Sequence, residues 1–129
     1  GVKGATDITG FGLAGHAMQM AKASGVSFRI NTKTLPKLPQ AMQLIEDGCV
    51  PGATYRNLDY VKGRVHFAAT VDMAHQSLCA DAQTSGGLFF AVDARFANQA
   101  IADLHKLGLH DAAIIGEVLP RGSKEVYFE

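Results

Sequence analysis

A carboxylate, hydroxyls and two glycines stand together in residues 6–13, which read TDITGFGL, directly ahead of an amphipathic stretch. The exposed N–H groups at a helix start attract anions, and glycines let a phosphate approach the backbone closely. Asp7 beside such a site is well placed to hold Mg²⁺, a hard cation that prefers oxygen ligands and often bridges to phosphate. Spacing alone favours a plainer interpretation, in which Asp7 or Thr9 caps the helix and Gly10 and Gly12 form a turn. The segment is neither a Walker motif nor a dinucleotide motif.

A second polar segment, residues 81–87 with the sequence DAQTSGG, leads into the apolar residues 88–90. Polar loops that contain glycine and lie at the end of a strand frequently contact ligands. The alternative, which this loop taken alone favours, is a plain turn that uses the unusual backbone angles open to glycine. Thr84, Ser85, Gly86 and Gly87 form the end of this loop, directly ahead of the apolar residues.

Residues 48–57, GCVPGATYRN, form a third candidate segment. Arg56 could bind phosphate through its forked guanidinium, although such an arginine is more often a solvated loop residue. Cys49 and Cys79 lie in apolar company, so we expect both to be buried small hydrophobic residues and not nucleophiles. The histidines show no spacing typical of a metal site and are expected at the surface: His16, His66, His75, His105 and His110.

Composition excludes several classes of protein. Twelve basic residues balance twelve acidic ones, the basic residues form no run, and Trp is absent, which argues against a nucleic-acid partner. The two cysteines have no CxxC or Cys/His spacing, so a zinc site or disulfide is not expected and a reducing cytoplasmic location fits. No stretch reaches the ~20 apolar residues of a membrane span, and no signal peptide opens the chain. Because the sequence starts at Gly1 and not at Met, we expect a piece of a longer protein.

The 129 residues suit one compact domain, and the hydrophobic pattern divides them into helices and strands. The expected elements are helices over 11–24, 38–47, 72–79 and 93–107, and strands over 26–30, 88–92, 112–118 and 125–128, with a turn at 120–122 joining the last two. Residues 88–92 are continuously apolar, which is typical of a strand buried on both faces. The second helix should turn Leu38, Ala41, Met42 and Ile45 inward. Closely spaced Pro and Gly residues, which interrupt helices and strands, predict a long loop over 49–65. Helices and strands interleave without strict repetition, so the predicted class is α+β.

Taken together, the segments resemble the C-terminal half of the selenophosphate synthetase (selenide, water dikinase) family. The resemblance rests on TDITGFGLAGHAMQMAKASGV, LPKLPQA, GCVPGATYRN, DAQTSGG and IGEV, which occur in the family's order and cover nearly the whole chain. It implies the fold of the aminoimidazole ribonucleotide synthetase superfamily: residues 1–129 as a single C-terminal α+β domain with a mixed sheet packed by helices. The ATP-binding N-terminal domain of such proteins is absent from this chain.

The resemblance also implies a function. Members transfer phosphate from ATP to selenide and give selenophosphate, AMP and orthophosphate, with Mg²⁺ required; selenophosphate then feeds selenocysteine and selenouridine synthesis. Asp7 matches the family's metal-binding aspartate, and residues 84–87 match a loop near the site. The catalytic Cys and its partner Lys belong to the N-terminal half, so this chain should carry no catalytic residue and be inactive alone. The intact enzyme is expected to be a homodimer that acts on small molecules. Ala53 and Ala82 replace a usual Gly and Pro, which we interpret as backbone adjustments.

Two alternatives stay open. One is a domain of a sister enzyme, such as thiamine-monophosphate kinase or the hydrogenase-maturation dehydratase, although the pairing of TGFG with QTSGG resembles the selenium branch more closely. The other is a freestanding binding module without catalysis, which a native gene beginning near Gly1 would favour.

Overall fold

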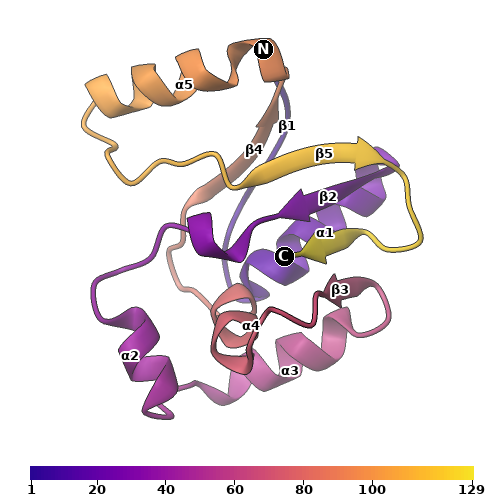
Figure 1. Cartoon of the computed structure of the whole chain (residues 1–129), viewed down its shortest axis with the longest axis vertical. Coiled ribbons are helices and arrows are strands. Elements are labelled where there is room, and N and C mark those ends of the chain that lie inside the picture. The colour runs from indigo at the N-terminus through magenta and orange to yellow at the C-terminus, as the bar shows by residue number, and fades with distance from the viewer.

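The computed structural model describes residues 1–129, and helices and strands alternate irregularly along them (Figure 1). The helices are α1 (Gly12–Ser24), α2 (Ala41–Glu46), α3 (Gly52–Val61), α4 (Met73–Cys79) and α5 (Ala94–Lys106), with a short 3₁₀ turn at Thr32–Thr34. The strands are β1 (Val2–Asp7), β2 (Val26–Ile30), β3 (Val65–Phe67), β4 (Leu88–Val92), β5 (Gly116–Pro120) and β6 (Val126–Phe128). The predicted α+β class is confirmed.

A four-stranded mixed sheet in the order β3-β6-β2-β5 forms the centre of the fold. β6 lies parallel to both of its neighbours, β2 and β3, whereas β5 runs antiparallel to β2. The last two strands follow each other in the chain, as predicted, but they do not pair with each other, because both pair with β2. β5 also begins four residues later than the predicted strand over 112–118.

Helix α1 packs against this sheet, as its apolar stripe predicts. Ala14, Ala17 and Ala21 are fully buried along one side, and their small side chains let the helix approach the strands closely. Gly25 ends the helix in the left-handed conformation (φ 65°), as expected for a residue at this position.

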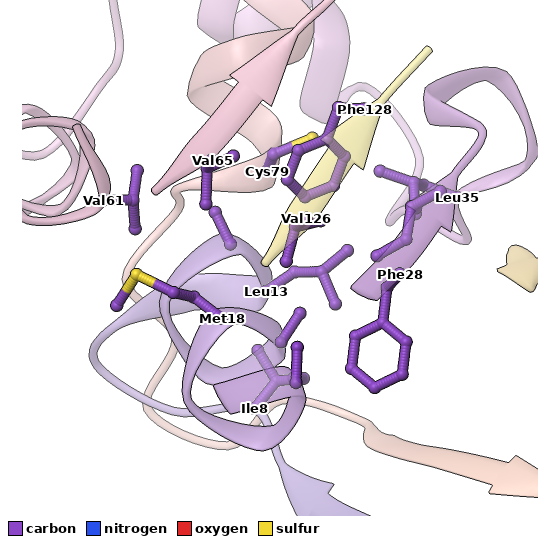
Figure 2. Close-up of a cluster of buried hydrophobic side chains, with 14 residues drawn as sticks. Ile8, Leu13, Met18, Phe28, Leu35, Val61, Val65, Cys79, Val126 and Phe128 are labelled. Atoms are coloured by element: carbon purple, nitrogen blue, oxygen red, sulfur yellow. The ribbon is translucent and has the colours of Figure 1, made fainter. Parts of the chain in front are cut away.

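The hydrophobic core lies between α1, the sheet and the ends of α3 and α4, and Figure 2 shows its side chains converging from these elements. The buried cluster comprises Ile8, Leu13, Ala14, Ala17, Met18, Ala21, Phe28, Ile30, Leu35, Val61, Val65, Cys79, Val126 and Phe128. Phe67 stacks on Phe128 with ring centroids 5.1 Å apart, which ties the edge strand β3 to β6.

The strands β1 and β4 form a separate antiparallel ribbon, and β1 was not anticipated from the sequence. On the inner face of the ribbon, Phe89 packs edge-on against Phe28 of the sheet, with centroids 5.3 Å apart. On the outer face Leu88 is 77% exposed. The prediction that residues 88–92 are buried on both faces is thus wrong, because Leu88 is exposed and the other residues of β4 are only half-buried.

The predicted helix over 38–47 is shorter in the structure. Gln40 adopts the left-handed conformation (φ 65°), so α2 begins only after it. Leu38, expected to face inward, is 81% exposed, and no residue of α2 is buried. Pro39 contributes to this outcome, since a proline disfavours helical angles in the residue before it.

The predicted loop over 49–65 is wrong, because residues Gly52–Val61 form the helix α3. Pro51 occupies the N-cap position, where its fixed φ and missing N–H cost a helix little. Thr54, Asn57 and Val61 then follow at helical spacing and form the buried face. The Pro-Gly pair that suggested a turn marks the start of a helix instead.

Two helix starts agree with the predictions. Asp72 accepts a hydrogen bond from the N–H of His75 and caps α4, and Asp93 accepts one from the N–H of Arg95 and caps α5. No residue of α5 is buried, and its half-buried apolar side chains belong to a stripe that is only partly covered. None of the helices combines the length and apolar character that crossing a membrane would require.

Candidate functional site

The two polar segments identified in the sequence lie side by side in the structure. The N–H of Gly86 donates to the carbonyl of Ile8 (3.1 Å), and the N–H of Ile8 donates to the carbonyl of Gly87 (2.9 Å). The N–H of Gln83 donates to the carbonyl of Thr9 at 3.1 Å. These three backbone hydrogen bonds join the end of β1 to the DAQTSGG loop, although roughly 75 residues separate the two segments in the chain.

Two glycines allow this close approach. A Cβ atom on Gly86 would lie 2.4 Å from the carbonyl oxygen of Ile8. A Cβ atom on Gly12 would lie 2.7 Å from the carbonyl carbon of Ala80, and Gly12 also has a positive φ of 69°. Any larger residue at either position would force the two segments apart.

The start of α1 carries no side-chain cap, so the interpretation of Asp7 or Thr9 as a capping residue is wrong. The hydroxyl of Thr9 forms a hydrogen bond with Nε2 of His16 (2.9 Å) and not with the backbone at the start of α1. The backbone carbonyl of Thr9, and not its side chain, accepts a hydrogen bond from the N–H of Gly12 at 3.0 Å. The side chain of Asp7 is thus not needed to start the helix.

Asp7 is the last residue of β1, and its side chain is exposed on the outer face of the ribbon, opposite Leu88. Its carboxylate takes part in none of the salt bridges of the domain. An exposed carboxylate without a cationic partner fits an oxygen ligand of Mg²⁺. No group of three or more His, Cys, Asp or Glu side chains in this chain could hold a metal ion, so Asp7 would supply only part of a coordination sphere.

Asp81, at the start of the DAQTSGG loop, has an unusual environment. Its side chain is half-buried, and this burial raises its pKa, with no hydrogen bond or nearby cation to offset the effect. Its carbonyl oxygen would lie 2.8 Å from a Cβ atom on Gly12, so the residue stands directly beside the start of α1. The sequence did not single out Asp81, because its environment depends on contacts between distant segments.

The third candidate segment contacts the other two segments through Asn57, and not through Arg56. Arg56, the predicted phosphate ligand, is exposed and forms no salt bridge. Its neighbour Asn57 is buried, and its Nδ2 donates to the carbonyl of Gly10 (2.8 Å) and to the carbonyl of Ala80 (3.0 Å). Asn57 lies in the segment predicted as a loop, but its helical spacing from Thr54 and Val61 could have indicated a buried position.

The remaining loop residues lie beside Ile8 and Thr9 through the backbone pairing described above. Thr84, Ser85 and Gly87 are exposed and Gly86 is half-buried. The hydroxyls of Thr84 and Ser85 form no hydrogen bond within the domain and are accessible to a ligand. Contact between these residues and a ligand stays a prediction.

The cysteines and histidines take different positions from those expected in several cases. Cys79 is buried, and burial raises the pKa of its thiol to about 12, which fits an inert core residue as predicted. Cys49 is exposed, so its predicted burial is wrong. His66 and His110 are at the surface, whereas His16, His75 and His105 are half-buried.

Comparison with known proteins agrees with the motifs. The family described as "AIR synthase related protein, C-terminal domain" matches residues 1–129. A selenide, water dikinase of Porphyromonas gingivalis is 53% identical over 117 residues, which cover 90% of this chain and 33% of the relative. Similar proteins with this name occur in Clostridioides difficile (40% identical, 97% of this chain, 36% of the relative) and Bdellovibrio bacteriovorus (42% identical, 99% of this chain, 36% of the relative).

The chain spans about a third of the length of these curated relatives. The resemblance carried by the sequence motifs is confirmed by these matches, and the mixed sheet with its surrounding helices agrees with it. The chain therefore belongs to the AIR synthase related proteins and corresponds to their C-terminal domain.

Proposed function

We propose that this chain is the C-terminal domain of a selenophosphate synthetase, which makes selenophosphate from selenide, ATP and water and releases AMP and orthophosphate. The observation that carries the proposal is that three backbone hydrogen bonds, made by Ile8 and Thr9, hold the DAQTSGG loop against the segment that carries the exposed Asp7 carboxylate. Relatives that this chain matches over most of its length are named selenide, water dikinase. Within the cell, the product would serve selenocysteine and selenouridine synthesis in the cytoplasm.

Asp7 would hold Mg²⁺ in this proposal, and Mg²⁺ would supply neutralisation of the phosphate charge. Phosphoryl transfer depends mostly on positioning and on compensation of charge, so an enzyme domain can contribute without a nucleophile of its own. The hydroxyls of Thr84 and Ser85 and the backbone at Gly86 and Gly87 would lie near the phosphates. The unpaired carboxylate of Asp7 fits this role because the domain leaves it exposed and uncompensated.

The other requirements of the reaction would come from outside this chain. We propose that an N-terminal domain binds most of the ATP and carries the catalytic Cys and Lys, and that the intact enzyme is a homodimer. Cys79 cannot replace that nucleophile, because burial raises the pKa of its thiol to about 12. The 129-residue chain alone should therefore form no selenophosphate.

The test is the replacement of Asp7 in the complete protein that contains this chain. Asp7→Ala and Asp7→Asn should lower the rate of selenophosphate formation by at least ~100-fold, because each removes an anionic metal ligand. Phosphorus NMR of anaerobic mixtures of ATP, Mg²⁺ and selenide would follow the products. Asp111→Asn, which changes an exposed carboxylate in the loop after α5, is the matched control and should keep the wild-type rate.

Two results would contradict the proposal. If Asp7→Ala turns over at the wild-type rate with its fold intact by circular dichroism, the metal role is wrong. If the wild-type protein consumes ATP with another acceptor and not with selenide, the function belongs to a sister enzyme of the superfamily.

A further inference from the structure

Asn57 on α3 makes an unusual double contact. A single nitrogen, Nδ2, donates one hydrogen to the carbonyl of Gly10 at 2.8 Å and the other to the carbonyl of Ala80 at 3.0 Å. The side chain is only 6% exposed, and Ala80 is fully buried. Both acceptors are main-chain groups, so the contact constrains the backbone and not merely a pair of side chains.

The two carbonyls belong to the two segments of the candidate site. Gly10 lies three residues after Asp7, and Ala80 lies immediately before Asp81 and the DAQTSGG loop. The backbone hydrogen bonds at Ile8 and Thr9 join the segments on the side of β1. Asn57 joins them a second time, next to the start of α1, where Gly12 already contacts Ala80 and Asp81.

The bridge uses both hydrogens of one nitrogen, which the carboxamide of asparagine supplies. An aspartate of the same shape would place acceptor oxygens against two carbonyl oxygens, and an alanine would leave both carbonyls without the donor. The bridge therefore depends on the amide group and not simply on the volume that Asn57 fills.

We infer that Asn57 is a positioning residue for phosphoryl transfer: it fixes the distance between the Asp7 segment and the DAQTSGG loop. The inference rests on the proposed function for its kinetic consequence, whereas its structural consequence can be measured without any substrate. A residue that orients a charged site matters because displacement of a reacting group by ~1 Å can cost ~100-fold in rate.

The experiment compares three variants of the complete protein. Asn57→Asp keeps the shape and removes the donors, Asn57→Ala removes the side chain, and Gln19→Ala is the matched control. Gln19 also links α1 to α3, through a 3.2 Å hydrogen bond from Nε2 to the hydroxyl of Tyr60, but it lies in the exposed part of that interface. All kinetics are measured at temperatures where circular dichroism shows each variant to be fully folded.

Asn57→Asp should lower kcat by ~100-fold, while Gln19→Ala keeps kcat within ~2-fold of the wild type. Amide hydrogen exchange supplies a readout independent of selenide or ATP. In Asn57→Asp, the N–H groups of Gln83, Gly86 and Gly12 should exchange at least ~10-fold faster, because their acceptors lie in the segments that the bridge joins. The N–H of Phe28, bonded to Glu125 in the sheet, should exchange as in the wild type.

Each outcome separates the two claims. A wild-type protein that forms no selenophosphate rejects the proposed function, but faster exchange at the three site amides in Asn57→Asp would still show that the bridge holds the segments. An unchanged kcat in a folded Asn57→Asp protein overturns the positioning role. Lost activity with unchanged exchange at Gln83 and Gly86 overturns it as well. If Asn57→Ala does not fold, the isosteric Asn57→Asp variant still decides.

Discussion

Helices α1 and α5 have the same length, thirteen residues, yet they contribute very differently to the domain. In α1, the buried residues include Gly12, Leu13, Met18 and three alanines, and they occupy more than half of the helix. In α5 no residue is buried. Phe96 in the helix is exposed, and so is Leu107, the residue directly after the helix. Both helices were expected from an apolar stripe, so the stripe alone does not reveal how much of a helix is covered.

The difference follows from the neighbours of each helix. α1 contacts the four-stranded sheet, β1 and α3. Small residues on several of its sides let these neighbours approach closely. α5 follows the β1–β4 ribbon and lies at the surface, with none of its residues buried. The stability of the domain should therefore depend strongly on α1 and weakly on α5, and matched substitutions can test this contrast.

The largest contrast is expected between two glycines with positive φ, one at each helix. Gly12→Ala should lower the free energy of unfolding by about 3 to 5 kcal/mol, because a left-handed conformation is combined with a Cβ atom 2.7 Å from the backbone of Ala80. Gly108→Ala, after α5, has φ 89° but open space around it, and should cost about 1 kcal/mol. Urea denaturation of both variants measures the difference, and equal losses would contradict the contrast.

A smaller contrast is expected from truncated side chains. Met18→Ala in α1 should lower the free energy of unfolding by about 3 kcal/mol, since Met18 is nearly fully buried and its removal leaves a cavity. Leu104→Ala in α5 should cost less than about 1 kcal/mol, because this side chain is only half-buried. If Leu104→Ala were as damaging as Met18→Ala, α5 would have to be covered in solution.

Two acidic residues extend the comparison to pH. Burial alone would raise the pKa of Glu125, but hydrogen bonds from Arg64 (2.6 Å) and Arg121 (2.8 Å) outweigh it and lower the pKa from 4.5 to about 2. The hydrogen bonds from Arg95 lower the pKa of Asp93 at the start of α5, but this pair lies at the surface.

A lowered folded-state pKa means that Glu125 stabilises the domain above pH 4.5 and that this contribution is lost as the pH falls toward 2. We expect it to be about 1 to 2 kcal/mol, because both arginines are partly exposed to solvent. Urea midpoints measured between pH 5 and pH 2.5 should fall less steeply for Glu125→Gln than for the wild type. Asp93→Asn, which can still cap α5, should flatten the curve much less, because the Asp93–Arg95 pair lies at the surface.

The sequence predicted those parts of the fold whose signals are local. The helix starts near Gly12, Asp72 and Asp93 and the helix end at Ser24 depend on neighbouring residues and were correct. The helix α3 and the strand β1 were missed. Pro51-Gly52 suggests a turn as readily as a helix start, and β1 gains its structure only by pairing with β4, which lies far along the chain.

The sequence identified the segments of the candidate site, but it did not predict how these segments contact one another. The three polar segments were all identified, and the family resemblance assigned Asp7 its proposed role. Asn57 and Asp81 were not assigned roles, because the bridge of one and the burial of the other arise from contacts between segments. Arg56, with its more obvious chemistry, turned out to be the exposed neighbour of the residue that makes the contact.

The position of β6 inside the sheet has a consequence for synthesis on the ribosome. β3 (Val65–Phe67) attaches to the sheet only through β6 (Val126–Phe128), which is translated about 60 residues later. At ~5 to 20 residues per second, the nascent chain holds β3 and the apolar side of α1 without their partner strand for several seconds. The sheet can therefore be completed only after the end of the domain has been synthesised. Until then its apolar surface is exposed, and this is the stage at which a chaperone would bind the nascent chain most readily.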